Sequence, residues 1–246
     1  SIACVELIKR MGVAHENVIL CDSKGVIYQG REDGMNQWKS AHAVQTDSRT
    51  LAEAMVGADV FLGLSIKDVV TTEMVQSMAD KPIIFAMANP DPEILPEIAK
   101  AARPDVLIAT GRSDYPNQIN NVLGFPYIFR GALDVRASTI NDEMKIAAAH
   151  AIAELAREDV PDEVGAAYSG RSMQYGPEYM IPAPFDPRLI LAVPQAVARA
   201  AMDSGVARKP IIDMAAYGHE LSARLDPTTA SLQAIFDNVR AHPRRV

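Results

Sequence analysis

The sequence predicts an α/β fold: a doubly wound, mostly parallel sheet followed by a C-terminal helical extension. Three observations support this prediction. Short apolar segments alternate with amphipathic helical segments, as in βαβ units. The apolar segments are continuous rather than alternating, which is typical of strands covered on both faces of a parallel sheet. With 246 residues, of which 48% are hydrophobic, the chain can also bury a sizeable core.

The predicted helices and strands follow one another along the first half of the chain. In order, we expect a helix over 2–12, a strand over 17–21 closed by a turn at 22–25, a helix over 51–56, a strand over 59–64, a helix over 72–78, a strand over 82–87, a helix reaching about residue 102 and a strand over 105–109. Thr50 and Glu53 have the spacing of a capping box, which marks a helix start. Because no capping residue precedes the first helix, we expect the chain to begin inside it.

The pattern changes downstream of Gly131. Thr139 is the expected N-cap of a long amphipathic helix, and another helix is expected over 187–202. Residues 205–246 show no strand pattern, and a last helix is expected over Ser231–Arg240. This part of the chain forms the predicted helical extension.

Composition excludes several function classes. The 24 Lys and Arg and 31 Asp and Glu residues give a net charge of −7 and are interspersed, which argues against nucleic acid or an anionic membrane as main partner. The two cysteines have no CxxC or histidine-rich companion, so neither a disulfide framework nor a zinc site is indicated. No apolar segment has the length of a membrane span and no signal peptide is visible, so we expect a cytoplasmic location.

Candidate ligand-binding residues follow from the predicted sheet. In the Rossmann-like arrangement, ligands bind at the carboxyl ends of the strands, where loops and helix N-termini present free N–H groups. The loops placed there are 22–25, 63–67, 88–91 and 110–121. Gly63 and Ser65 of the second loop are therefore candidate cofactor-binding residues.

The turn at residues 22–25 carries the candidate adenosine-side residues. An acidic residue that ends a strand accepts ribose hydroxyls in dinucleotide-binding folds, and Asp22 has that position if a first strand and a glycine-rich loop precede Ser1. Ser23 and Lys24 can bind a 2′-phosphate, which favours NADP over NAD. Two alternatives remain: Asp22 caps its own turn, and Lys24 is a solvated surface residue.

Asn89 follows the strand over 82–87. Its amide offers a donor and an acceptor to ribose hydroxyls or a carboxamide, and Pro90 favours an extended backbone before it. The alternative is an Asx turn before the proline. The histidines, including His42, lack a partner at the spacing of a catalytic triad and are interpreted as surface residues.

The segment over 109–122 is unusually rich in polar groups. It contains Gly111, four side-chain amides and the charged pair Arg112 and Asp114. We interpret it as ligand-contacting, with Gly111 a candidate cofactor-binding residue. The alternative for Arg112 and Asp114 is that they only bridge each other.

Three segments, at 22–31, 85–90 and 117–126, resemble malic enzymes in order and spacing, and Phe129–Asp134 is similar to the bacterial form. The resemblance covers about residues 1–205. The segment over 235–246 resembles the opening of the phosphotransacetylase-like domain of hybrid bacterial malic enzymes.

The resemblance implies oxidation of L-malate with NADP or NAD, followed by decarboxylation to pyruvate and CO2 with Mg²⁺ or Mn²⁺. It places Asp22 at the adenosine ribose, Asn89 near the nicotinamide ribose, and Asn120 at malate with Asn121 close by. The catalytic acid and base, the metal ligands and the glycine-rich loop are expected before Ser1. We therefore assign no catalytic or metal-binding residue in this chain, and expect the chain alone to be inactive and the enzyme to be a homo-oligomer.

These expectations divide the chain into three parts: an NAD(P)-binding part over 1–135, helices over 136–205, and a linker with the start of a further domain over 206–246. Two alternatives stay open. Another Rossmann dehydrogenase, such as an amino-acid dehydrogenase, would lack the Asn-Asn-Val-x-x-Phe-Pro pattern. A non-catalytic nucleotide-sensing domain would not need the amide-rich loop over 117–121.

Overall fold

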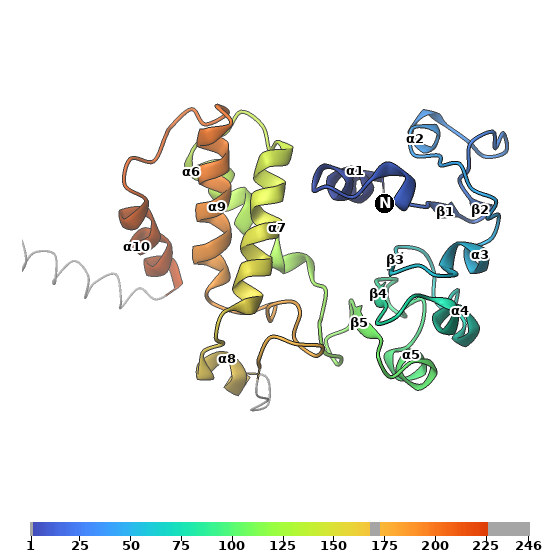
Figure 1. The fold of residues 1–246 in the computed structure, drawn as a ribbon. Coiled ribbons are helices and arrows are strands. Elements are labelled where there is room, and N and C mark those ends of the chain that lie inside the picture. Colours follow the sequence, from blue (N-terminus) through green and yellow to red (C-terminus); the bar gives the residue numbers. More distant parts are fainter. Residues whose placement is uncertain (1, 168–172, 226–246) are drawn as a thin grey trace, which may run out of the picture. The chain divides into compact units, whose positions relative to one another are not determined.

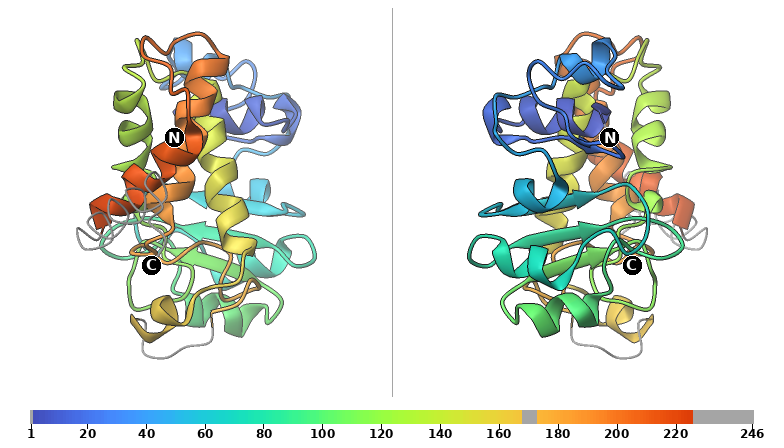
Figure 2. Two further views of the ribbon diagram at one scale, coloured as in Figure 1. Left: turned by 90° about the vertical axis from the view of Figure 1, so that its left-hand side faces the viewer. Right: turned by 90° about the vertical axis from the view of Figure 1, so that its right-hand side faces the viewer.

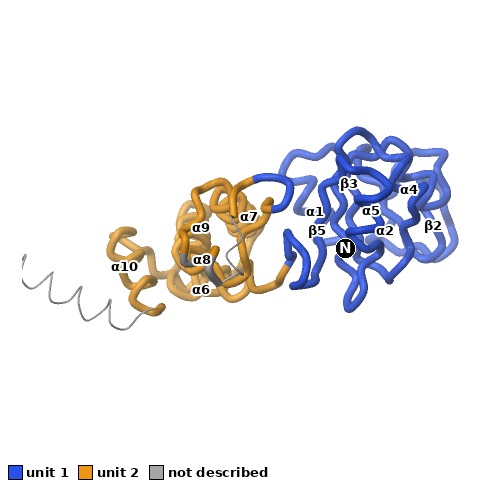
Figure 3. Tube along the Cα trace, turned by 90° about the horizontal axis from the view of Figure 1, so that it is seen from below, with its two compact units in different colours: residues 1–119, 176–178 blue, residues 120–175, 179–246 orange. Residues whose placement is uncertain are grey.

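The computed structural model describes residues 2–167 and 173–225 (Figure 1). The chain forms two compact units, shown in different colours in Figure 3. Unit 1 comprises Ser1–Ile119 and Gly176–Glu178, and unit 2 comprises Asn120–Tyr175 and Tyr179–Val246. The predicted three-part division at 135 and 205 stays a prediction, and the helix predicted over Ser231–Arg240 lies outside the described residues.

Unit 1 is an α/β unit. Its elements are α1 (Ile2–Arg10), η1 (His15–Asn17), β1 (Cys21–Asp22), β2 (Gly25–Val26), α2 (Gln37–Ser40), α3 (Leu51–Met55), β3 (Val60–Gly63), α4 (Thr72–Ser77), β4 (Ile83–Ala86), α5 (Pro96–Ala102) and β5 (Leu107–Thr110). Strands β3, β4 and β5 form a parallel sheet in that order. Ile83 lies opposite both Val60 and Leu107. The predicted α/β class and parallel sheet are confirmed.

Helices α3, α4 and α5 cover one face of this sheet (Figure 1). Ile84 in the central strand is fully buried there, among Met55 of α3, Val75 of α4 and Ala99 of α5. On the other face, Leu62 is 43% exposed. Strands β3 and β4 therefore alternate in burial within unit 1, because the described helices that pack on them lie on a single face. In β5, by contrast, Ile108, Ala109 and Thr110 are all buried.

The capping box that opens α3 is confirmed. The Thr50 hydroxyl accepts a hydrogen bond from the Glu53 backbone N–H at 3.2 Å, and the Glu53 carboxylate accepts one from the Thr50 N–H at 3.0 Å. These contacts satisfy two donors that a helix start leaves without intrahelical partners. The spacing in the sequence was sufficient to locate this helix.

The strand predicted over 17–21 does not join the parallel sheet. Residues 15–17 form η1, and β1 pairs with β2 as a short antiparallel hairpin. The Ile27 N–H donates to the Leu20 carbonyl at 2.8 Å, which extends the hairpin by one bond. The turn at 22–25 reverses the chain, so this apolar segment pairs with its own continuation.

Unit 2 is helical. Its elements are η2 (Asn121–Leu123), α6 (Tyr127–Asp134), α7 (Asp142–Arg157), α8 (Asp162–Ala167), α9 (Leu189–Asp203) and α10 (Met214–Leu225). Helices α7 and α9 lie side by side (Figure 2), and residues of α6, α7, α9 and α10 form a single apolar core. The helix predicted over 187–202 is confirmed as α9, whereas α10 was not predicted.

The N-cap predicted for α7 was wrong. Asn141, not Thr139, caps the helix, because its side-chain oxygen accepts the Met144 N–H at 3.1 Å. Asp142 and Glu143 then occupy the first turn, where carboxylates interact favourably with the helix dipole. No helix in the described residues is both long and apolar enough to cross a membrane.

Helices α6 and α9 approach closely at Gly131. A Cβ atom at this position would lie 2.5 Å from the Pro194 carbonyl oxygen and 2.9 Å from Val197 Cβ. At these distances any side chain would push the helices apart. Asp134, one turn further along α6, accepts a hydrogen bond from the Tyr217 hydroxyl of α10 at 2.8 Å.

Candidate functional site

Three loops meet at one edge of the parallel sheet. Strands β3, β4 and β5 end at Gly63, Ala86 and Thr110, and parallel strands place their carboxyl ends at the same edge. The loops that follow carry the predicted residues Ser65, Asn89 and Gly111. Ser65, Asn89 and Gly111 are exposed, whereas Gly63 is buried. The structure therefore brings these four candidates to one edge of unit 1.

Glu93 joins two of these loops and was missed by the sequence analysis. Its fully buried carboxylate accepts hydrogen bonds from the Ser65 N–H at 2.9 Å and from the Ala88 N–H at 3.0 Å. A Cβ atom on Gly63 would lie 2.4 Å from its carboxyl carbon. The available signal was an acidic residue followed directly by Ile94 and Leu95, where a surface glutamate is not expected.

Asp22 lies at the centre of a charged cluster in the β1–β2 hairpin. Its carboxylate accepts hydrogen bonds from the Lys24 N–H at 2.9 Å, from the Arg31 guanidinium at 2.9 Å to each oxygen, and from the Lys39 ammonium at 2.6 Å. Burial alone would raise the pKa of Asp22, but the hydrogen bonds from Lys39, Lys24 and Arg31 outweigh it and lower the pKa to about 2. Asp22 is therefore a fully ionised, firmly held carboxylate at neutral pH.

The same cluster shows the surroundings of Lys24, for which a solvated surface position was the alternative interpretation. Its ammonium contacts Asp33 at 2.5 Å, and its side chain is 50% exposed. Both structural alternatives are thus present: Asp22 caps its own turn, and Lys24 lies at the surface. Ser23, between them, is exposed. Arg31 and Lys39 were missed, although Arg31 closes the very segment in which Asp22 was recognised.

Several polar side chains of the loop after β5 form hydrogen bonds within unit 1 itself. Asn117 is buried and its amide nitrogen donates to the Ile108 carbonyl at 3.2 Å and the Pro177 carbonyl at 2.8 Å. Arg112 and Asp114 bridge each other through two hydrogen bonds of 2.9 and 2.6 Å, as the alternative interpretation had it. This pairing raises the pKa of Arg112 and lowers that of Asp114. The density of polar side chains therefore stabilises the loop itself.

Asn120 and Asn121 belong to unit 2. The Asn120 side-chain oxygen accepts the Val122 N–H at 3.1 Å and caps η2, and Asn121 is exposed. The candidates for cofactor binding all lie in unit 1. The role of Asn120 and Asn121 in substrate binding stays a prediction.

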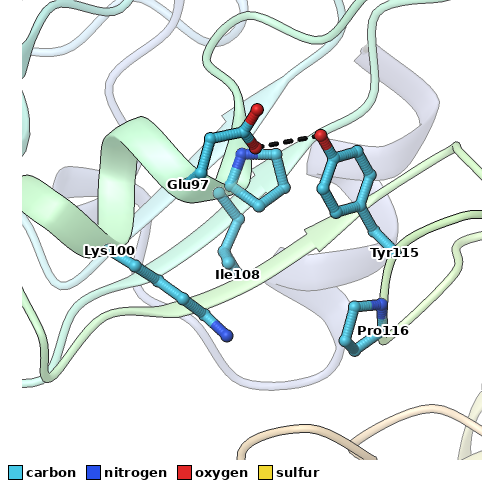
Figure 4. A pocket seen from close by; sticks show the side chains of 6 residues that line it. Glu97, Lys100, Ile108, Tyr115 and Pro116 are labelled. Atoms are coloured by element: carbon cyan, nitrogen blue, oxygen red, sulfur yellow. Dashed lines mark hydrogen bonds between the residues drawn. The ribbon is translucent and has the colours of Figure 1, made fainter.

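A small pocket lies between α5 and the loop after β5 (Figure 4). It has a volume of about 200 Å³. The Tyr115 hydroxyl donates to the Glu97 carboxylate at 2.9 Å across it, and Lys100 pairs with Glu178 at 2.5 Å. Tyr115 and Pro116 belong to the loop predicted to contact ligand, but none of the residues assigned individually to cofactor or substrate lines this pocket.

His42 corrects the interpretation of the histidines as surface residues. It is 6% exposed, and its Nδ1 accepts a hydrogen bond from the Lys9 ammonium at 3.1 Å. Burial first, and then the charge of Lys9, lowers the pKa of His42. Within residues 2–167 and 173–225, no group of three or more His, Cys, Asp or Glu side chains is arranged to hold a metal ion.

Comparison with known proteins gives consistent matches. Residues 4–168 match the family described as malic enzyme, NAD binding domain. The chain is 69% identical over 246 residues to an NADP-dependent malic enzyme of Rhizobium meliloti (strain 1021), covering 100% of this chain and 32% of that protein. It is 54% identical over 222 residues to an NAD-dependent malic enzyme of the same organism, covering 90% of this chain and 29% of that protein.

A solved structure shows the same fold. The Entamoeba histolytica malic enzyme aligns with a TM-score of 0.79 at 33% identity, covering 99% of this chain and 49% of that chain. The chain spans about a third of the length of the two Rhizobium relatives, at 32% and 29%.

Proposed function

The chain belongs to the family of malic enzyme NAD-binding domains, and from this premise we propose that it is the dinucleotide-binding segment of an enzyme that oxidises and decarboxylates L-malate to pyruvate. The observation that carries the proposal is the carboxyl edge of the β3-β4-β5 sheet, where Ser65, Asn89 and Gly111 lie together in unit 1. Family membership sets aside the amino-acid dehydrogenase alternative. The nucleotide-sensing alternative predicts binding without turnover.

The exposed edge residues suit a dinucleotide. Asn89 offers both a donor and an acceptor to ribose hydroxyls or to the carboxamide, and Gly111 leaves room for a close backbone approach, since a Cβ there would meet no atom nearer than 3.9 Å. When bound, NAD(P)⁺ supplies the hydride acceptor for malate oxidation. The contribution of this chain is to fix the position of the dinucleotide.

We propose that the cofactor is NADP rather than NAD. The cluster around Asp22 places three cationic side chains, of Lys24, Arg31 and Lys39, against two carboxylates, of Asp22 and Asp33. The cations hold both oxygens of Asp22, which disfavours a simple ribose contact. A 2′-phosphate can take the place of the exposed Asp33 on Lys24 and balance the cluster.

This chain supplies few residues for the remaining parts of the reaction. Asn120, with Asn121 close by, is proposed to bind malate. The described residues offer no set of ligands for Mg²⁺ or Mn²⁺, so no step through a cation is assigned to them. We propose that the metal ligands and the catalytic acid and base belong to other parts of the whole enzyme. We also propose that the whole enzyme is a homo-oligomer with a cytoplasmic location.

The test is malate-dependent NADP⁺ reduction with Mn²⁺. In the intact enzyme, Asn120→Ala should lower kcat for malate about 100-fold, because a misplaced substrate loses its alignment with the hydride acceptor. The Kd for NADP⁺ should change little. Gln76→Ala, at an exposed position of α4, is the control and should leave both unchanged.

Two outcomes would contradict the proposal. An intact enzyme that binds dinucleotide but never turns malate over would support the nucleotide-sensing alternative. A loss in Asn120→Ala confined to NADP⁺ affinity would remove Asn120 as a malate ligand.

A further inference from the structure

We infer that Glu93 is a positioning residue, whose buried carboxylate holds the loops after β3 and β4 in the conformation that binds the dinucleotide. The inference rests on the proposed function of the sheet edge. It goes beyond that function by naming a residue that touches no ligand and sets the geometry of those that do.

The contacts of Glu93 reach two loops that are far apart in sequence. One carboxylate oxygen accepts the Ser65 N–H at 2.9 Å and the Ser65 hydroxyl at 3.3 Å, and the other accepts the Ala88 N–H at 3.0 Å. The three donors are two backbone amides and one hydroxyl. A buried carboxylate is stable only while such donors stay turned toward it. The charge therefore enforces the conformation of both loops at once.

Gly63 supplies the space that this arrangement needs. A Cβ atom at residue 63 would lie 2.6 Å from each oxygen of the Glu93 carboxylate. The end of β3 therefore has room for the carboxylate because residue 63 has no side chain. The Gly63 carbonyl in turn accepts the Met87 N–H at 3.2 Å, which ties the ends of β3 and β4 together beside the carboxylate.

Glu93 is also held by its own backbone. Its carbonyl accepts the Val70 N–H at 3.1 Å, and the neighbouring Pro92 carbonyl accepts the Asp68 N–H at 3.3 Å. These bonds anchor the segment that carries Glu93 to the stretch before α4. The carboxylate is thus presented from a fixed backbone.

The consequence differs for the two predicted cofactor residues. Asn89 directly follows Ala88, so the bond from the Ala88 N–H sets the backbone that presents the exposed Asn89 side chain. Ser65, by contrast, turns both its N–H and its hydroxyl toward Glu93. Ser65 therefore belongs to the support of the site, and its hydroxyl is not the group offered to the ligand.

The experiment compares Glu93→Gln with wild type in the intact enzyme. Glutamine keeps the size of the side chain but replaces one acceptor oxygen with an NH2 group, which faces the N–H of Ser65 or of Ala88. We expect the Kd values for NADP⁺ and NAD⁺ to rise together, by about tenfold. Titration calorimetry measures both Kd values. Glu154→Gln, at an exposed position on α7 in unit 2, is the matched control and should not change either Kd.

Amide hydrogen exchange supplies the readout that separates positioning from general loss of stability. In Glu93→Gln the Ser65 and Ala88 amides should exchange faster, while the amides of Ile84 and Ile108 in the sheet keep their protection at a temperature well below unfolding. Equal Kd values for wild type and Glu93→Gln, or unchanged exchange at Ser65 and Ala88, would overturn the inference. If wild type itself binds no dinucleotide, the proposed function fails, and the exchange data still decide whether Glu93 holds the loops.

Ser65→Ala keeps the inference testable should Glu93→Gln not fold. It removes only the 3.3 Å hydroxyl contact and retains the N–H bond, so we expect a change in Kd of less than about threefold. A loss of tenfold or more would mean that the hydroxyl binds the ligand directly, which would overturn the assignment of Ser65 to the support.

Discussion

Each unit contains a glycine that leaves room for a close neighbouring group. The neighbouring group is a charged side chain in unit 1 and a helix in unit 2. In unit 1, Gly63 makes room for the Glu93 carboxylate, which binds two loops at the edge of the sheet. In unit 2, Gly131 makes room for the Pro194 carbonyl and the Val197 side chain, which sets the spacing of α6 and α9. The first close approach organises exposed polar loops and the second an apolar helix interface. Substitutions at the Gly63–Glu93 contact should therefore act on dinucleotide binding, and those at the Gly131 contact on stability.

The largest effect on stability is expected for Gly131→Ala. The added methyl group meets a backbone carbonyl that cannot move aside, and overpacking of this kind costs about 1–3 kcal/mol. Hydrogen exchange should show the loss in α6 and α9, with the Kd for NADP⁺ unchanged. Gly124→Ala, where the new Cβ would lie 3.5 Å from a flexible Ile128 side chain, should have little effect. A change in NADP⁺ affinity without loss of stability in Gly131→Ala would break the comparison.

Lys24→Ala in unit 1 should have the opposite effect, a loss of binding without a loss of stability. Loss of a charge-assisted contact to the 2′-phosphate should weaken NADP⁺ binding by about tenfold, or about 1.4 kcal/mol, and leave NAD⁺ binding and unfolding unchanged. Lys145→Ala is the control, because Lys145 has a similar exposure and also pairs with a carboxylate, but lies in unit 2. Equal losses for NADP⁺ and NAD⁺ would remove Lys24 as the discriminating residue.

A smaller effect is expected when the pH is lowered, which should decrease the stability of unit 1. Because burial and Lys9 lower the pKa of His42 below its unfolded value near 6.5, the unfolded chain takes up a proton first as the pH falls. Stability should therefore be complete above about pH 6.5 and decrease below it. His42→Gln should flatten this decrease, measured by chemical unfolding between pH 7.5 and 5.5, whereas the exposed His150→Gln should not. An identical pH profile in His42→Gln would show that another group is responsible.

Sequence patterns located the elements whose determinants are local. The Thr50–Glu53 spacing predicts α3 because both partners of the capping box lie within one turn. The same reasoning placed the cap of α7 two residues too early, since Thr139 and Asn141 are both good caps. Asn141 is in addition held by a hydrogen bond from its amide to the Ser204 hydroxyl at 2.9 Å, which lies 63 residues away in the sequence. The strand over 17–21 was misplaced because its pairing depends on the direction in which the following turn sends the chain.

The site was predictable to the level of its loops, and its internal contacts were not. Asn89 and Gly111 could be placed at the candidate edge because strand ends mark the ligand edge of a parallel sheet. Asp22 was chosen as an acidic residue that ends a predicted strand, but that strand forms a separate antiparallel hairpin. Glu93 was not predicted as a site residue because its partner Ser65 lies 28 residues away, and no periodic pattern connects them. Arg31 and Lys39 escaped because their meeting at Asp22 depends on how the loop after the hairpin folds back.

The most direct test of the division between the units is hydrogen exchange of the intact enzyme with and without saturating NADP⁺. The account predicts slower exchange at 22–25, 63–67 and 88–91 in unit 1, and unchanged exchange in α7 and α9 of unit 2. Protection confined to α7 and α9, or no protection at these three loops despite bound NADP⁺, would contradict it.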